Sequence, residues 1–361
     1  MMLSRKGSVA FVLLLGVILL PNRCWGQSKD SSGFERVATI TLPITTGNAA
    51  FDISWVDPAT HRYYLADRVA AGIDIVDTAT NKLLGKIGGF VGQDAKGTKY
   101  WGPSGVLVIP GLNQAWAGDG DSTIKVVDLQ LGKVVDTIST GGSLRADELA
   151  YDDRDQVIMI GNDFDAPPFL TFISAQPGHK ILGRIPLNDA TDGLEQPVWD
   201  RATGRFYVAV PASKANPGGE IWVVDPKTMK MTESFPLSQC NPHGLALGPA
   251  QHLLIGCRMK ALIMNLRNPG EIEEIPQAGG SDEVWFNPGD DKYFLGGTRT
   301  GLSIIDAVTN TWIATIPTGQ GAHSVAADPV TNQVYVPIQA DAKDPACLHG
   351  CIAVFADRRE Q

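Results

Sequence analysis

The sequence is poor in the residues on which many enzymes depend. Its 361 residues include only five cysteines and six histidines. They contain no HExxH, no phosphate-binding glycine loop, no GxSxG and no CxxCH. These absences exclude the common sequence motifs for zinc proteases, nucleotide binding, serine hydrolases and haem attachment.

Long hydrophobic runs are also scarce. The only one occupies residues 9–20, preceded by Arg5 and Lys6 and followed by a proline and small residues. This pattern is typical of a secretory signal peptide, which we assign to residues 1–26. No later segment approaches the roughly 20 apolar residues that a membrane-spanning helix needs. We therefore expect a mature protein without a membrane span, located in the periplasm or secreted.

Basic residues are in the minority. Removing residues 1–26 takes away Arg5, Lys6 and Arg23, so 27 of the 30 basic residues remain against 39 acidic ones, a net charge of −12. An acidic surface repels phosphate groups, so we expect neither nucleic acid nor an anionic membrane as a partner.

A frame of two short strands around a turn recurs seven times after residue 50. The copies read FDISWVDPATHRYYLA, PSGVLVIPGLNQAWAG, ADELAYDDRDQVIMIG, EQPVWDRATGRFYVAV, PHGLALGPAQHLLIG, SDEVWFNPGDDKYFLG and AHSVAADPVTNQVYVP. Each is followed by a third apolar run, such as IDIVD, and six of them by a fourth, such as KLLGKI. The seventh copy ends without a fourth strand, but residues 36–42, RVATITL, have the same pattern before the first copy.

Four-stranded units with a period in the 40s predict a β-propeller. We therefore expect an all-β fold, a seven-bladed β-propeller with four antiparallel strands per blade, in which the N-terminal strand completes the last blade. No linker interrupts the repeats, so residues 34–358 form one predicted domain, which we expect to be monomeric.

The repeats resemble those of secreted YVTN-repeat β-propellers. The segments that carry the resemblance are RYYLAD, RFYVAV and VYVPI for the second strand, and IDIVDTATNKLLGKI, IKVVDLQLGKVVDTI and LSIIDAVTNTWIATI for the third and fourth. It covers nearly all of the mature chain and implies the propeller fold, but it leaves the function open because its motif marks turns and strand packing.

Four cysteines remain after residue 26, an even number that favours two disulfides in an oxidising compartment. We predict that Cys347 pairs with Cys351 across CLHGC, and that Cys240 pairs with Cys257 across the hairpin of the fifth blade.

The same position at the start of the first strand is polar in every repeat. It holds Asp52, Ser104, Asp147, Glu195, His243, Asp282 and His323. The first strand of each blade lines the channel of a propeller, so we expect these residues to form a ring. We predict a divalent metal site at Asp52, His243, Asp282 and His323, with Zn²⁺, Mn²⁺ or Fe²⁺ favoured by mixed imidazole and carboxylate ligands and Ca²⁺ by the all-oxygen side. Two alternatives stay open, namely a wet polar channel without any cofactor and a metal-free acid/base pair.

Loops between the second and third strands should reach the same face. Together with the rest of the ring, they supply the candidate ligand-binding residues at the channel mouth, which are Ser104, Asp147, Glu195, Arg68, Asn162, Arg258 and Arg299. Arginines beside an acidic mouth can hold a carboxylate or phosphate, or can simply pair with the acids around them.

Two functions fit these features. The first is an exported binding or scaffold protein that takes a small molecule, protein or peptide at its loop-rich face. The second is a metal-dependent hydrolase of lactones or esters, because the ring resembles the metal site of gluconolactonase-type propellers. The sequence does not decide whether the protein is an enzyme.

Overall fold

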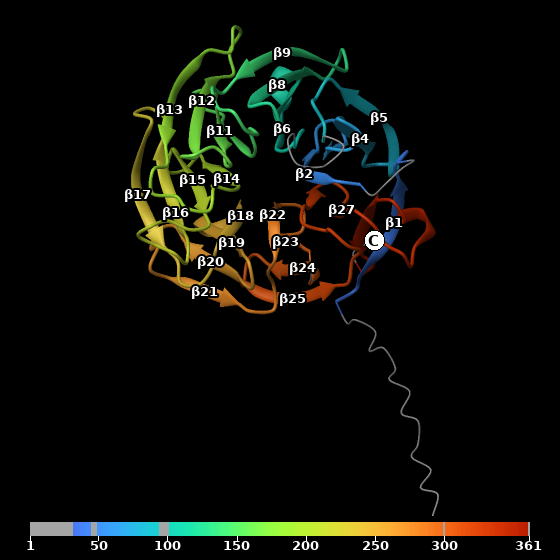
Figure 1. Cartoon of the computed structure of the whole chain (residues 1–361). Coiled ribbons are helices and arrows are strands. Elements are labelled where there is room, and N and C mark those ends of the chain that lie inside the picture. The colour runs from blue at the N-terminus through green and yellow to red at the C-terminus, as the bar shows by residue number, and fades with distance from the viewer. Residues whose placement is uncertain (1–31, 45–48, 94–100, 299, 360–361) are drawn as a thin grey trace, which may run out of the picture. The chain divides into compact units, whose positions relative to one another are not determined.

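The computed structural model describes residues 32–44, 49–93, 101–298 and 300–359, and the regular structure in them is almost entirely β-strand. In this part of the chain the strands form seven antiparallel sheets of four. Figure 1 shows the sheets as blades of a ring around a central axis. The described helical elements are single 3₁₀ turns, η1 (Pro110–Leu112), η2 (Pro249–Gln251) and η3 (Pro345–Cys347). The predicted seven-bladed β-propeller is confirmed.

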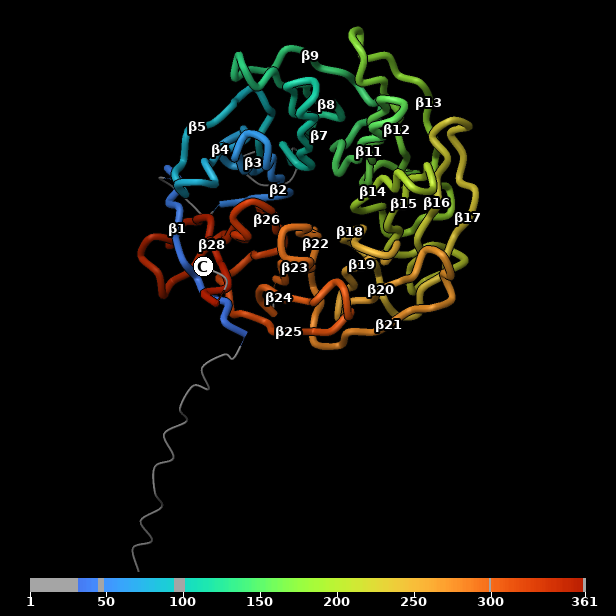
Figure 2. Tube along the Cα trace, turned by 180° about the vertical axis from the view of Figure 1, so that it is seen from behind, coloured from blue at the N-terminus to red at the C-terminus, as the bar shows by residue number. Residues whose placement is uncertain are grey.

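Six blades each use four strands that follow one another in the chain. The strands are β2 (Phe51–Asp57), β3 (Arg62–Asp67), β4 (Gly72–Asp77) and β5 (Lys82–Gly88); β6 (Val106–Ile109), β7 (Gln114–Asp119), β8 (Thr123–Asp128) and β9 (Lys133–Ser139); β10 (Leu149–Asp152), β11 (Val157–Asn162), β12 (Phe169–Ser174) and β13 (Ile181–Pro186); β14 (Pro197–Asp200), β15 (Arg205–Val210), β16 (Glu220–Asp225) and β17 (Lys230–Pro236); β18 (Pro242–Leu247), β19 (His252–Cys257), β20 (Ala261–Asn265) and β21 (Ile272–Ile275); β22 (Ser281–Asn287), β23 (Lys292–Gly297), β24 (Gly301–Asp306) and β25 (Thr311–Ile316). Seen from the opposite side, the first strands lie nearest the axis and the fourth strands lie outermost (Figure 2).

The seventh blade joins the two ends of the ring. It consists of β26 (Ala326–Asp328), β27 (Gln333–Ile338), β28 (Cys351–Asp357) and, on its outer edge, β1 (Phe34–Thr41). β1 runs antiparallel to β28, from Phe34 opposite Asp357 to Thr41 opposite Cys351. The N-terminal strand therefore closes the last blade, as its sequence pattern predicts.

The blades hold together through apolar faces. The second and third strands are buried on both sides, because each blade is covered by two neighbours. Aromatic pairs bridge successive blades, with Tyr63 stacked on Tyr335 at 5.0 Å and Phe172 edge-on to Phe206 at 6.4 Å between ring centroids. The fourth strands of the first six blades are more exposed than the second and third strands, because they form the outer rim of the ring; in β9, for example, exposed and half-buried residues alternate.

Small residues near the axis allow the inner strands to approach closely. A Cβ atom on Gly118 would lie 2.4 Å from the backbone oxygen of Ala146, and one on Gly161 would lie 2.1 Å from the Leu194 side chain. The inner strand of the next blade occupies that space, so a larger residue at either position would push two blades apart.

Both predicted disulfides are present. Cys240 bonds Cys257, with Cα atoms 4.7 Å apart, and Cys347 bonds Cys351, with Cα atoms 4.9 Å apart. The first ties the end of β19 to the segment that leads into β18, and so holds the start of β18 at the axis. The second closes the turn that leads into β28.

The disulfides indicate an oxidising, extracellular-type compartment. The predicted signal peptide, residues 1–26, lies outside the described residues. Among the residues that the structure does describe, no helix is both long enough and apolar enough to cross a membrane.

Candidate functional site

In six blades a β-bulge at the start of the first strand aims side chains at the axis. In the second blade, Ser104 N donates to Gly118 O at 2.9 Å while Gly118 N donates to Gly105 O at 3.0 Å. Ser104 and Gly105 therefore both lie opposite Gly118. The strand register shifts at the corresponding point in three other blades, between Phe51 and Ser54, Pro242 and Leu245, and Ser281 and Val284. Bulges of this kind re-aim side chains beside functional sites.

The bulges create two successive rings. The first, which we name the mouth ring, consists of the seven polar residues predicted from the sequence: Asp52, Ser104, Asp147, Glu195, His243, Asp282 and His323. The residues that follow them form the second ring: Ile53, Gly105, Glu148, Gln196, Gly244, Glu283 and Ser324. Sequence analysis identified the mouth ring and overlooked the second one.

One half of the mouth ring is a row of alternating acids and imidazoles. His243 Nδ1 lies 3.4 Å from Glu195 Oε1 and 3.5 Å from Asp282 Oδ1. His323 Nε2 lies 4.0 Å from Asp282 Oδ2 and 3.5 Å from Asp52 Oδ1. The structure thus brings together all four predicted metal ligands and adds Glu195 to them.

These neighbours favour the charged form of both imidazoles. Burial opposes protonation of His243, but Asp282 and Glu195 outweigh it and raise its pKa to about 10. His323 is likewise opposed by burial, and Asp52 and Asp282 raise its pKa. His243 is therefore protonated at neutral pH, and its charge offsets part of the negative charge of the row.

The carboxyl groups on either side of His243 have pKa values shifted in opposite directions. Burial raises the pKa of Glu195 to about 7, with His243 opposing and Asp282 adding to the effect. Burial also disfavours ionisation of Asp282, but His243 and His323 hold its pKa well below the usual range. Glu195 is thus poised to exchange a proton near neutral pH, while Asp282 remains an anion.

Arg68 extends the row of contacts to Ser104. Its guanidinium pairs with Asp52, and Nη2 donates to Ser104 Oγ at 3.2 Å. Burial opposes ionisation of Asp52, but Arg68 and His323 outweigh it and lower the carboxyl pKa. Arg68 is itself buried and lies 5.3 Å from the centre of the Trp101 ring, which leaves it committed to the protein.

Arg145 supplies the second cation, and sequence analysis did not select it. Its Nη2 lies 2.6 Å from an oxygen of Asp147 and 2.6 Å from an oxygen of Asp163. Burial raises the pKa of Asp147, and Arg145 opposes this shift only in part, since the same guanidinium also pairs with Asp163. The signal in the sequence is its place two residues before Asp147, in the loop that enters the mouth ring.

A cavity of about 300 Å³ opens beside the imidazoles. It is lined by His243, Arg258, Gly280, Ser281, Asp282, Thr298 and His323. Arg258 therefore reaches the mouth as predicted from its loop, whereas Arg299 lies outside the described residues. Asn162 is buried, and its amide donates to Ser122 Oγ at 2.9 Å and to Asp165 Oδ2 at 3.2 Å, so its contacts join two loops of the protein.

The row contains two overlapping sets of three metal-capable side chains. One set is Asp52, Asp282 and His323, and the other is Glu195, His243 and Asp282, with the ligand atoms of each set within 4.8 Å of one another. His243 Nδ1 is buried and makes no well-aligned hydrogen bond within the described residues, although Glu195 and Asp282 lie at ion-pair distance from it. A divalent cation between these groups would satisfy that nitrogen, so the donor set fits a metal ion.

No known family model matches the chain, and no curated protein matches it in sequence.

Proposed function

We propose that this protein is an exported binding protein of the YVTN-repeat type that holds a divalent metal ion at its channel mouth. The observation that supports it best is the pair of overlapping ligand sets, with the unbonded Nδ1 of His243 between Glu195 and Asp282. Asp52 is paired with Arg68, so Glu195, His243 and Asp282 form the better set, with His323 next to them.

The donor atoms suggest which ions the site would prefer. Imidazole nitrogen with two carboxylates suits Zn²⁺, Mn²⁺ or Fe²⁺ better than Ca²⁺, which prefers oxygen alone. Such an ion would offer an open coordination position to an oxygen or nitrogen atom of a ligand in the 300 Å³ cavity. Arg258 and Thr298 in the cavity wall would contact the rest of that ligand, most favourably an anionic small molecule or peptide.

Metal binding would compete with protons. A metal ion needs neutral imidazole, whereas the pKa of His243 is raised to about 10 and that of His323 is raised as well. We therefore expect affinity to increase steadily between pH 6 and pH 9, with protons released as the metal binds.

Titration calorimetry of chelator-treated protein with Zn²⁺, Mn²⁺ and Ca²⁺ tests the proposal. His243→Ala should weaken binding at least tenfold, because it removes a ligand without breaking a strand hydrogen bond. Asp306→Ala is the control, since Asp306 accepts hydrogen bonds from Val308 N and Thr309 N in a turn and should not affect binding. Absence of heat with all three ions, or equal affinity in the His243 variant, would contradict metal binding.

A metal-dependent hydrolase is the second candidate, and the protonation behaviour of Glu195 favours it. With a pKa of about 7 and His243 3.4 Å away, Glu195 can accept a proton from water at neutral pH. In this candidate the metal ion would instead be held by the other ligand set, Asp52, Asp282 and His323, and would supply polarisation of a carbonyl group. In that case Glu195→Gln should abolish turnover of a lactone or ester panel and leave metal affinity within a few fold, whereas turnover that survives in this variant would exclude the assigned base.

A further inference from the structure

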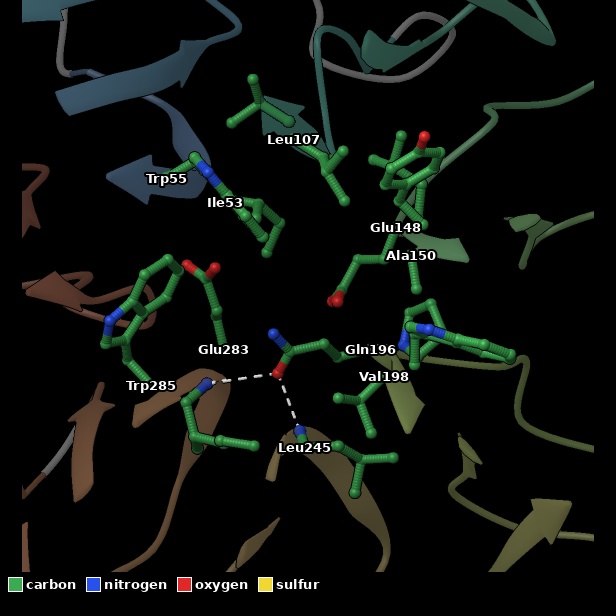
Figure 3. A pocket seen from close by; sticks show the side chains of 18 of the residues that line it. Ile53, Trp55, Leu107, Glu148, Ala150, Gln196, Val198, Leu245, Glu283 and Trp285 are labelled. Atoms are coloured by element: carbon green, nitrogen blue, oxygen red, sulfur yellow. Dashed lines mark hydrogen bonds between the residues drawn. The ribbon is translucent and has the colours of Figure 1, made fainter. Parts of the chain in front are cut away.

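A second cavity lies further along the axis than the mouth ring. Its volume is about 380 Å³, within the range of small-molecule sites. The first strands of six blades line it, and most of the side chains are apolar, among them Ile53, Leu107, Ala150, Val198 and Leu245 (Figure 3). We name it the axial cavity.

Three polar side chains of the second ring enter this apolar space. They are Glu148, Gln196 and Glu283. Figure 3 shows the Glu148 carboxyl group pointing into the cavity, whereas the Glu283 carboxyl group lies along the wall, where it meets Ser54 and Ser324. Polar groups that converge in an otherwise apolar cavity fix the orientation of a ligand.

The two acids differ in how the protein satisfies them. Glu283 Oε2 accepts hydrogen bonds from Ser54 N at 3.1 Å, from Ser54 Oγ and from Ser324 Oγ. Glu148 is only 4% exposed, and its carboxyl group, unlike its backbone oxygen, has no hydrogen bond or ion pair to any residue that the structure describes. A buried carboxyl group without a partner is costly, so its retention in a cavity points to a ligand.

Gln196 contributes its oxygen to the protein rather than to the cavity. Gln196 Oε1 accepts from Leu245 N at 2.7 Å and from Val284 N at 3.3 Å, as the dashed lines in Figure 3 mark. These two bonds fix the amide and leave the carboxyl groups of Glu148 and Glu283 as the acceptors that a ligand can use.

We propose that the axial cavity binds a small organic ammonium ion, with its charged nitrogen at Glu148 and Glu283 and its apolar body against the aromatic and aliphatic wall. Trp55 and Trp285 meet edge to face at 5.2 Å in that wall, and indole is the aromatic ring that attracts organic cations most strongly.

The charge around Glu148 favours a cation over any other ligand. After burial, the carboxyl groups of Asp282, Asp147, Glu195 and Glu283 all disfavour ionisation of Glu148, and Asp282 contributes most among them. The basic groups closest to this part of the channel are committed elsewhere, Arg145 to Asp147 and Asp163, and Arg68 to Asp52. A carboxylate ligand would add to this repulsion, whereas an ammonium donates hydrogen bonds to groups that only accept when ionised.

Binding would displace protons from Glu148. Burial first, and then Asp282, Asp147, Glu195 and Glu283, raise the pKa of Glu148 well above its ordinary range. A protonated Glu148 would release its proton when an ammonium ion pairs with it. Affinity should accordingly rise with pH until the amine itself loses its proton.

The test is calorimetric titration with 2-phenylethylamine at pH 6.0 and pH 8.5, in EDTA and in two buffers of different ionisation enthalpy. We expect at least tenfold tighter binding at the higher pH, and a heat that depends on the buffer because protons are released. 2-Phenylethanol, which has the same ring but no charge, should bind at least tenfold more weakly. No binding of the amine at pH 8.5, or equal affinity for the alcohol, would overturn the proposal.

The variant Glu148→Gln tests whether Glu148 binds the ammonium group. The Glu148 carboxyl group makes no hydrogen bond in the described part of the chain, so the variant should fold, as near-ultraviolet circular dichroism can confirm. Amine affinity should fall at least tenfold, and proton release should decrease. Glu233→Gln on the exposed face of β17 is the matched control and should behave like the wild type. Unchanged affinity and proton release in Glu148→Gln would overturn the assignment.

The proposal is independent of the metal site. It rests on the second ring, and EDTA keeps the mouth ring free of metal during the titration. His243→Ala should retain amine binding, so failure of either proposal can be told apart from failure of the other.

Discussion

Replacing Glu283 by Gln should make the protein more stable in alkaline solution. Glu283 is 1% exposed, and one of its oxygens accepts from Ser54 N and from the hydroxyl groups of Ser54 and Ser324. Gln has the shape of a protonated Glu and can accept the same three hydrogen bonds through its amide oxygen. The variant thus removes the cost of ionisation and keeps the contacts.

The size of the effect follows from the shift in pKa. Burial raises the pKa of Glu283 from 4.5 to about 8, in spite of the opposing hydrogen bonds. Between these values the folded protein keeps a proton that the unfolded chain has lost, so the free energy of unfolding falls by about 1.4 kcal/mol for each pH unit. The raised pKa of Glu283 contributes its full stabilisation of the fold below pH 4.5. This contribution, about 5 kcal/mol at most, is lost as the pH rises through 8.

Urea unfolding of both proteins at pH 5, 7 and 9 measures this difference. We expect nearly equal midpoints at pH 5 and a growing advantage for Glu283→Gln at pH 7 and 9, because the other titrating groups are common to both proteins. Glu233→Gln on the exposed face of β17 should show no such trend. A constant difference between wild type and Glu283→Gln over the three pH values would refute the assignment of a protonated, buried acid.

Three further predictions concern parts of the ring outside the axial cavity. Ile40→Ala in β1 should lower the free energy of unfolding by about 2–5 kcal/mol in a denaturant titration, because Ile40 is buried in the closing blade, whereas Thr41→Ala on the exposed edge should cost little. Replacing Cys240 and Cys257 by Ser should cost about 3 kcal/mol by the same measurement, from the 17-residue separation that the disulfide spans, and an unchanged midpoint would contradict its contribution. Arg145→Gln should cost about 3–5 kcal/mol and lower the melting temperature, since it removes the guanidinium that pairs with both Asp147 and Asp163, and a variant as stable as the wild type would contradict a stabilising role of these ion pairs.

The fold could be predicted from the sequence because each blade repeats the same local signals. Turn residues recur at a fixed distance from the apolar strands, as in Asp57, whose oxygens accept from Ala59 N and Thr60 Oγ1. The missing fourth strand of the seventh repeat and the extra strand before the first could be counted without knowledge of the structure. Repetition turns seven weak patterns into one firm prediction.

The mouth ring could be predicted for the same reason, whereas the partners of its residues could not. A fixed offset from the turn locates His243 and Asp282 on adjacent blades, but nothing in that offset reports that Arg145 pairs with Asp147. The length and direction of a long side chain decide such contacts, and these depend on the loop that carries it.

The second ring was missed because the sequence analysis assumed regular strands. In a regular strand successive side chains alternate between two faces, so Glu148 and Glu283 would point away from the channel if their neighbours Asp147 and Asp282 point into it. The bulges break this alternation, since two residues of the first strand face a single residue of the second. A bulge has no sequence signal of its own here, and only the backbone hydrogen bonds reveal it.

The two rings together explain why protons are central to any function of this channel. The mouth ring holds imidazoles with raised pKa values beside acids, and the second ring holds acids with raised pKa values in an apolar wall. In both places a proton compensates for negative charge that the protein does not pair with Arg68 or Arg145. A cation of either proposed kind would replace those protons, a metal ion in the mouth ring and an ammonium ion in the axial cavity. Each ligand should therefore release protons when it binds. If substitutions in one ring abolish this release for a given ligand, that ring binds the ligand.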